Sequence, residues 1–128
     1  MRASVFLITK GDDGTERVFA EAEAAEREGC FEYSFAKDGS RFRIRTGSCA
    51  YIAREGELSY ELSLDPHRDT RACIRSAYGD IFVSVHTAFL EAAQGAEGSR
   101  LCCAYELNFS GTIRKHRLTF SAKHGQER

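Results

Sequence analysis

Apolar and polar residues alternate along most of the chain, which is the pattern of strands that bury one face. Short turn signals built from Gly and Asp separate these runs, and Pro66 is the one proline. The turn signals lie at Gly11–Gly14, Asp38-Gly39, Glu55-Gly56, Asp65-Pro66, Tyr78-Gly79, Gly95–Ser99 and Ser110–Thr112. No stretch between them is long enough for a linker, so the pattern predicts one all-β domain of about eight to ten strands over residues 1–128.

Pairing the runs across their turns tests this prediction. A two-residue loop at Asp38-Gly39 sets Phe35 opposite Phe42 and Tyr33 opposite Ile44, and the other face of this hairpin is then polar. A shift of one residue would mix the two faces, so the agreement supports the register.

Two further hairpins divide in the same way. A loop at Glu55-Gly56 sets Tyr51 opposite Tyr60, which places both tyrosines on the apolar face. A loop at Tyr78-Gly79 likewise gathers the apolar residues of its two strands on one side.

The segment Thr15–Glu28 is the ambiguous one. It is rich in Ala and Glu, and Val18, Ala22 and Ala25 recur at helical spacing. The alternation of alanine with glutamate after Val18 fits a strand almost as well, and the residues alone leave both structures open.

The connections decide the architecture. Nearly every predicted connection has the length of a hairpin loop, whereas a Greek key needs longer crossings. The sequence therefore predicts an antiparallel up-and-down barrel, in which closure removes the free edges of the sheet.

Charge and cysteine content exclude several function classes. Eighteen basic and nineteen acidic residues leave a net charge of −1, which disfavours nucleic-acid binding. Five cysteines without a C-x-x-C spacing predict neither a zinc site nor a disulfide framework. The N-terminal apolar run is too short for a signal peptide or a membrane helix. We therefore expect a cytoplasmic protein with free thiols that binds neither nucleic acid nor a membrane.

No catalytic motif is present: the chain lacks the nucleophile elbow, the dinucleotide and phosphate loops and the zinc-protease helix. We expect no enzyme, no cofactor and no metal ion.

The candidate binding residues come from the inferred inner face. In the last hairpin Arg114 and His116 face inward beside Tyr105, where a barrel mouth would hold an anionic head while an apolar tail lies among aromatic rings. The candidate ligand-binding residues are Tyr33, Tyr51, Tyr60, Tyr105, Arg114 and His116. An aromatic core with strand ends that emerge into water explains the same residues without a ligand.

Two rows of arginine fall on outward faces. Arg41, Arg43 and Arg45 share one face of a strand, opposite Glu32, which predicts a solvated surface with a cross-strand ion pair. A second polar face is treated as surface as well; it holds Arg71, Cys73, Arg75, Ser84 and His86.

Between Ala50 and Phe120 a series of short elements carries a resemblance. These elements are Arg54-Glu55-Gly56, the turn Leu64-Asp65-Pro66, Tyr78-Gly79 followed by Ile81, Val83, Val85 and Thr87, the strand Leu101–Leu107 with Tyr105 in it, and the hairpin across Gly111. In their order and spacing they resemble the YwiB-like family, uncharacterised bacterial proteins with a calycin-type (lipocalin-related) β-barrel. The resemblance implies that Thr15–Glu28 is mainly strand. It implies no catalytic residue and no function.

Two functions follow as hypotheses. The first is non-enzymatic binding of a small apolar or anionic molecule inside the barrel, with a partly apolar ligand that carries an anionic head as one form of it. The alternative is a protein-interaction module or homodimer that uses edge strands or the outer sheet face.

Overall fold

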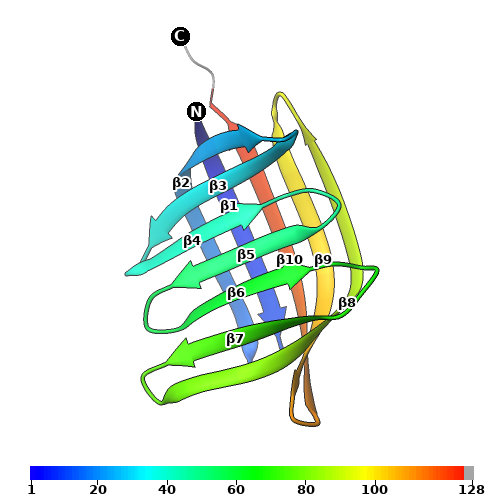
Figure 1. Cartoon of the computed structure of the whole chain (residues 1–128). Helices are drawn as coiled ribbons and strands as arrows, with labels where there is room; N and C mark the ends of the chain where they lie inside the picture. Colours follow the sequence, from blue (N-terminus) through cyan, green and yellow to red (C-terminus); the bar gives the residue numbers. More distant parts are fainter. Residues whose placement is uncertain (126–128) are drawn as a thin grey trace.

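The computed structural model describes residues 1–125, which form ten antiparallel strands and no helix (Figure 1). The strands are β1 (Arg2–Gly11), β2 (Gly14–Arg27), β3 (Cys30–Lys37), β4 (Ser40–Arg45), β5 (Ala50–Glu55), β6 (Ser59–Leu64), β7 (Thr70–Ser76), β8 (Gly79–Gly95), β9 (Gly98–Phe109) and β10 (Thr112–His124). Each strand pairs with the next, and β10 pairs with β1, so the sheet closes. The predicted all-β up-and-down barrel is confirmed. Among the described residues, no helix is long and apolar enough to cross a membrane.

The ambiguous segment is strand β2. It pairs with β1 along its first part and with β3 along its last part, and Val18 and Ala22 point into the core. Hydrogen bonds and burial supplied by two neighbours therefore decide the structure against the helical propensity of Ala and Glu.

The β3–β4 hairpin has the predicted register. Phe35 pairs with Phe42 and Tyr33 pairs with Ile44, while Asp38 and Gly39 both adopt positive φ. That backbone conformation is the one that a two-residue hairpin loop requires.

The β5–β6 hairpin differs from the prediction. Arg54 pairs with Tyr60 and Ile52 with Leu62, because the connection is the three-residue loop Gly56–Leu58. The additional loop residue reverses the faces of β5, so Ile52 points into the core and Tyr51 points outward. The prediction that Tyr51 faces inward is wrong.

The β7–β8 hairpin is displaced by two residues from the predicted register. Ile74 pairs with Ile81 instead of Val83, because the loop is Ala77-Tyr78. A displacement by two keeps every side chain on its predicted face.

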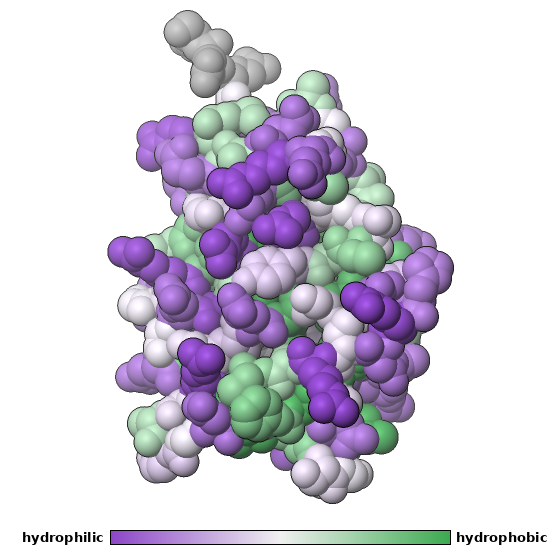
Figure 2. Space-filling model, in the orientation of Figure 1, coloured by the Kyte–Doolittle hydropathy of each residue, from purple (hydrophilic) through white to green (hydrophobic). Residues whose placement is uncertain are grey.

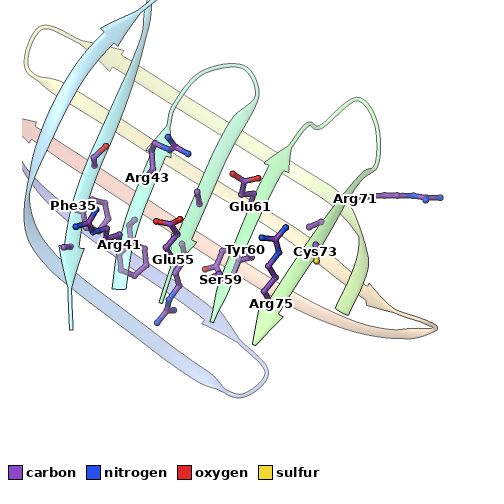
Figure 3. A pocket seen from close by; sticks show the side chains of 16 residues that line it. Phe35, Arg41, Arg43, Glu55, Ser59, Tyr60, Glu61, Arg71, Cys73 and Arg75 are labelled. Atoms are coloured by element: carbon purple, nitrogen blue, oxygen red, sulfur yellow. The ribbon is translucent and has the colours of Figure 1, made fainter. Parts of the chain in front are cut away.

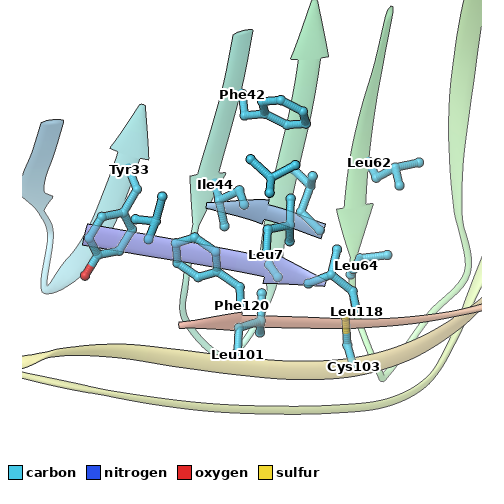
Figure 4. Packing of buried hydrophobic residues seen from close by; sticks show 14 of the residues in the cluster. Leu7, Tyr33, Phe42, Ile44, Leu62, Leu64, Leu101, Cys103, Leu118 and Phe120 are labelled. Atoms are coloured by element: carbon cyan, nitrogen blue, oxygen red, sulfur yellow. The ribbon is translucent and has the colours of Figure 1, made fainter. Parts of the chain in front are cut away.

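The middle of the barrel is filled with side chains. Tyr33, Ile44 and Phe120 come from three different strands, are fully buried and point into the same space (Figure 4). Cys103 joins this core and is 2% exposed. The interior is therefore a packed core and not a pore.

Side-chain hydrogen bonds cap one end of the barrel, which we call the Gln94 end. The Gln94 amide donates to the carbonyl of Gly29 at 2.5 Å and accepts from the Thr46 hydroxyl at 2.9 Å and from the Phe31 amide at 3.3 Å. One residue of β8 thus bridges the β2–β3 and β4–β5 connections. The opposite end, at the β1–β2, β5–β6 and β9–β10 connections, is called the His116 end.

The barrel wall is weakest between β6 and β7. These strands pair only through Ser59 with Arg75 and Tyr60 with Ile74. Farther along, the Thr70 hydroxyl donates to the carbonyl of Ser63 at 2.6 Å. Every other strand pair has a longer ladder, and the ladders of β8, β9 and β10 run almost the full length of these strands.

Candidate functional site

Inward-facing polar side chains gather near the His116 end, and we call them the inner polar belt. Arg54 of β5 pairs with Tyr60 of β6, while Tyr105 of β9 lies between Thr87 of β8 and His116 of β10. Glu16 of β2 completes the belt through its ion pair with Arg54. The alternation of each strand therefore brings polar groups from six strands to one level of the interior.

Arg54 is the charged group of the belt. Its Nη1 donates to both carboxylate oxygens of Glu16, at 3.2 and 3.4 Å, and its guanidinium lies 5.2 Å from the centre of the Phe42 ring. The Nε atom is buried and has no hydrogen-bond partner among residues 1–125. A buried donor without an acceptor destabilises the fold unless another group satisfies it.

Tyr105 and His116 stack on each other, with ring centres 5.3 Å apart and planes inclined by 20°. Burial raises the pKa of Tyr105 well above its ordinary value, so the hydroxyl stays protonated. Burial lowers the pKa of His116, so the imidazole is neutral at pH 7. Gly11 makes room for this ring, because a Cβ at that position would lie 2.9 Å from His116 Nδ1.

Unsatisfied polar groups concentrate in the belt. Besides Arg54 Nε, the Thr87 hydroxyl is buried without a partner in the described part of the chain. Tyr105, the neighbour of Thr87, is 5% exposed. Buried polar groups in native proteins are nearly always paired, so Arg54 Nε and the Thr87 hydroxyl are the groups of the belt that a further hydrogen-bonding molecule would satisfy.

Arg114 lies at the rim of the same end. Its Nη1 donates to Asp13 Oδ1 at 3.3 Å, and its side chain is 44% exposed. The inward face predicted for Arg114 and His116 is confirmed, because they pair with Leu107 and Tyr105. The charge of Arg114 is, however, already balanced by Asp13.

Tyr33 lies at the opposite, Gln94 end. Its hydroxyl is 2.5 Å from Ser99 Oγ and 2.7 Å from His124 Nε2, and His124 Nδ1 is 3.0 Å from the carbonyl of Ala96. Burial raises the pKa of Tyr33, so the phenol stays neutral. This fully buried tyrosine is separated from the belt by the packed core and holds the barrel end together.

Tyr51 lies on the outer surface. The guanidinium groups of Arg43 and Arg45 lie 5.6 and 5.3 Å from the centre of its ring, and its hydroxyl donates to Glu61 at 2.6 Å. Of the six predicted residues, the structure therefore brings four together at the His116 end, namely Tyr60, Tyr105, Arg114 and His116.

Sequence reasoning missed Arg54, Glu16 and Thr87. Arg54 was assigned to the outer face by the assumed two-residue loop at Glu55-Gly56. A usable signal was the apolar Ile52 two residues earlier, since residues that differ by two share a face. The same rule gives the inward face of Glu16 from Val18 and that of Thr87 from Val85.

A groove of about 880 Å³ lies on the outer face of β3 to β7 (Figure 3). Its rims carry Arg41 and Arg43 of β4 on one side and Arg71 and Arg75 of β7 on the other, and we call it the outer arginine groove. Glu55 and Glu61 stand between the two rims, and small residues form the floor, including Ser34, Ala36, Ala53, Ser59 and Cys73. Figure 2 shows mostly hydrophilic side chains on the front face of the barrel. The structure thus joins two arginine rows that are far apart in the sequence.

Comparison with known proteins identifies a likeness of fold. No family model matches the chain, and no curated protein matches it. The barrel is similar to the crystal structure of the ywiB protein from Bacillus subtilis. The TM-score is 0.77 at 14% sequence identity, over 98% of this chain and 91% of that chain. At this identity the likeness shows a YwiB-like fold and no shared activity.

Proposed function

We propose that the protein is a non-enzymatic binding protein that holds a small, partly apolar molecule at the His116 end of the barrel. The observation that carries the proposal is the pair of buried, unpartnered polar groups on the inner polar belt, Arg54 Nε and the Thr87 hydroxyl, beside the nearly buried Tyr105. A ligand with hydrogen-bond acceptors would satisfy both groups as donors, and the hydroxyls of Thr87 and Tyr105 can also accept.

Apolar side chains beside the belt suit the rest of such a ligand. Ile74 pairs with Ile81 on the inward face, and Ile81 is 49% exposed at the end of its strand. Leu58, in the neighbouring β5–β6 loop, is 39% exposed. Sites of this kind combine an apolar lining with a few convergent polar groups.

The charges of the site favour a neutral ligand. Glu16 balances Arg54 and Asp13 balances Arg114, while His116 is neutral at pH 7. An anionic ligand has to displace Glu16 from Arg54. We therefore propose a neutral acceptor group, such as a carbonyl, as the part of the ligand that contacts the belt.

We also propose that the barrel is of the calycin type and that the protein is bacterial and cytoplasmic. The up-and-down closure and the likeness to the Bacillus subtilis protein support the first two statements. Five cysteines without a disulfide support the third.

Dye binding tests the proposal with two matched substitutions. Tyr105→Phe removes one hydroxyl from the belt, and Tyr51→Phe makes the same chemical change on the outer surface. We expect the neutral dye Nile red to bind the wild-type barrel, and Tyr105→Phe to weaken it about fivefold, the value of one hydrogen bond. Tyr51→Phe should leave the affinity unchanged. Native mass spectrometry of the freshly purified protein should show a small molecule that collisional activation removes.

Two results would refute the proposal. One is a barrel that binds neither dye nor a co-purified molecule. The other is equal affinity in wild type and Tyr105→Phe. Titration with the anionic dye anilinonaphthalene sulfonate tests the proposed charge of the ligand. If this dye binds at the belt more tightly than Nile red, the ligand is anionic and not neutral.

A further inference from the structure

We infer that the outer arginine groove is a docking site for an extended acidic segment of a partner protein. The groove opens on the outside of the barrel, whereas the proposed ligand site lies inside it; Arg54 and Tyr60 of the inner polar belt also line the groove, but the arginines of its rims point outward. Closure of the sheet leaves no free edge strand among the described residues, so a partner has to use an outer face.

The groove has an excess of positive charge. Arg41, Arg71 and Arg75 form no ion pair within the described part of the chain, and Arg43 shares Glu32 with Arg45, at 3.4 and 3.6 Å. The acidic residues of this face are Glu55 and Glu61 in the groove and Asp80 of β8; Glu55 is the cross-strand partner of Arg41, and Asp80 is the cross-strand partner of Arg75. The arginines that line the groove outnumber the glutamates, which favours a partner of opposite charge.

The dimensions of the groove suit an extended chain. The rims on β4 and β7 are separated by three strand spacings, about 14 Å. Between the rims, the small residues Ala53 of β5 and Ser59 of β6 line the groove. An extended peptide advances about 3.4 Å per residue, so carboxylates about four residues apart reach both rims.

An exposed aromatic residue favours a protein partner. Phe82 of β8 is 76% exposed and pairs with Cys73, between Arg71 and Arg75 of β7. Aromatic residues next to arginine are typical of the residues that dominate protein–protein binding energy. Glu55 and Glu61 in the middle of the groove would repel the continuous charge of a nucleic acid, whereas a peptide can place a basic side chain there.

Fluorescence polarisation tests the inference with the full chain. The probe is a labelled ten-residue peptide with glutamates four residues apart, a lysine between them and one leucine. The controls are the same peptide with glutamine for glutamate, and a ten-nucleotide single-stranded DNA. The variant Arg71→Gln/Arg75→Gln alters the groove, and Arg17→Gln/Arg100→Gln makes the same charge change on exposed residues outside it.

We expect the groove variant, and the glutamine peptide, to bind about tenfold more weakly, and the control variant to bind like wild type. Phe82→Ser should weaken binding as well. Equal binding by both double variants overturns the inference. Tighter binding of the DNA that depends on Arg71 and Arg75 assigns the groove to phosphates and also overturns it. If the wild-type chain sediments as a dimer and the groove variant sediments as a monomer, the groove binds a second copy of the chain, which also overturns the inference. Nile red affinity of the groove variant reports on the inner site separately.

Discussion

Two tyrosines illustrate how position determines what a hydroxyl does for stability. The Tyr33 hydroxyl lies within hydrogen-bond distance of Ser99 and His124 in the fully buried Gln94 end, whereas the Tyr51 hydroxyl contacts Glu61 at the surface. Removing the first leaves two buried polar groups unpaired. Removing the Tyr51 hydroxyl lets water hydrate the Glu61 carboxylate instead, so the free energy of unfolding changes little.

We therefore predict that Tyr33→Phe lowers the free energy of unfolding by about 1–3 kcal/mol, the penalty for buried groups that lose a partner. Tyr51→Phe should change it by less than about 0.5 kcal/mol, as surface substitutions usually do. Urea unfolding followed by circular dichroism measures both. Equal losses in the two variants would mean that the buried network does not hold the Gln94 end together.

At the scale of the element, close approach of two backbones makes one glycine of the β8–β9 hairpin indispensable. Gly98 begins β9, and a Cβ at this position would overlap the backbone carbonyl oxygen of Ala122 in β10. Gly29, in the β2–β3 turn, also has positive φ, 80°, but a Cβ there meets nothing within 4 Å.

We predict that Gly98→Ala lowers the free energy of unfolding by about 3 kcal/mol, because β10 has to move away from β9. Gly29→Ala should lower it by about 1–2 kcal/mol, the penalty for a left-handed backbone alone. Thermal and urea unfolding of both variants give the comparison. A loss in Gly98→Ala no larger than in Gly29→Ala would show that the strands yield without strain.

Loop chemistry explains which elements could be predicted from sequence. Asp38-Gly39 suits the positive φ of a two-residue loop, so the β3–β4 register was predictable. The loop Gly56–Leu58 has no such signature, and its length reversed the face of Tyr51 and Arg54. For β2, pairing with β1 and β3 decides between strand and helix. The residues of β2 alone do not specify these two partners.

At the scale of the whole molecule, closure assembles the candidate site from strands that are distant in the chain. Tyr105 and His116 lie within one hairpin, so alternation alone predicted that both side chains face inward side by side. Thr87 and Arg54 reach the same level of the interior only because the barrel closes, and no local pattern encodes that meeting. The outer arginine groove does not need closure, since β4 to β7 are consecutive neighbours in the sheet and their outward residues share one surface.

Closure also distributes stability unevenly around the wall, which hydrogen exchange can measure. Between β6 and β7 the ladder is limited to Ser59–Arg75 and Tyr60–Ile74, whereas β9 is paired along both sides. Local opening needs the fewest broken hydrogen bonds at the β6–β7 seam, so its free energy is the lowest there. We predict that the amides of Arg71–Cys73 exchange at least about a hundredfold faster than those of Leu101–Cys103, a difference of about 2.7 kcal/mol in opening free energy. Similar protection in both strands would mean that the barrel opens as one unit, and that the short ladder does not define a weak seam.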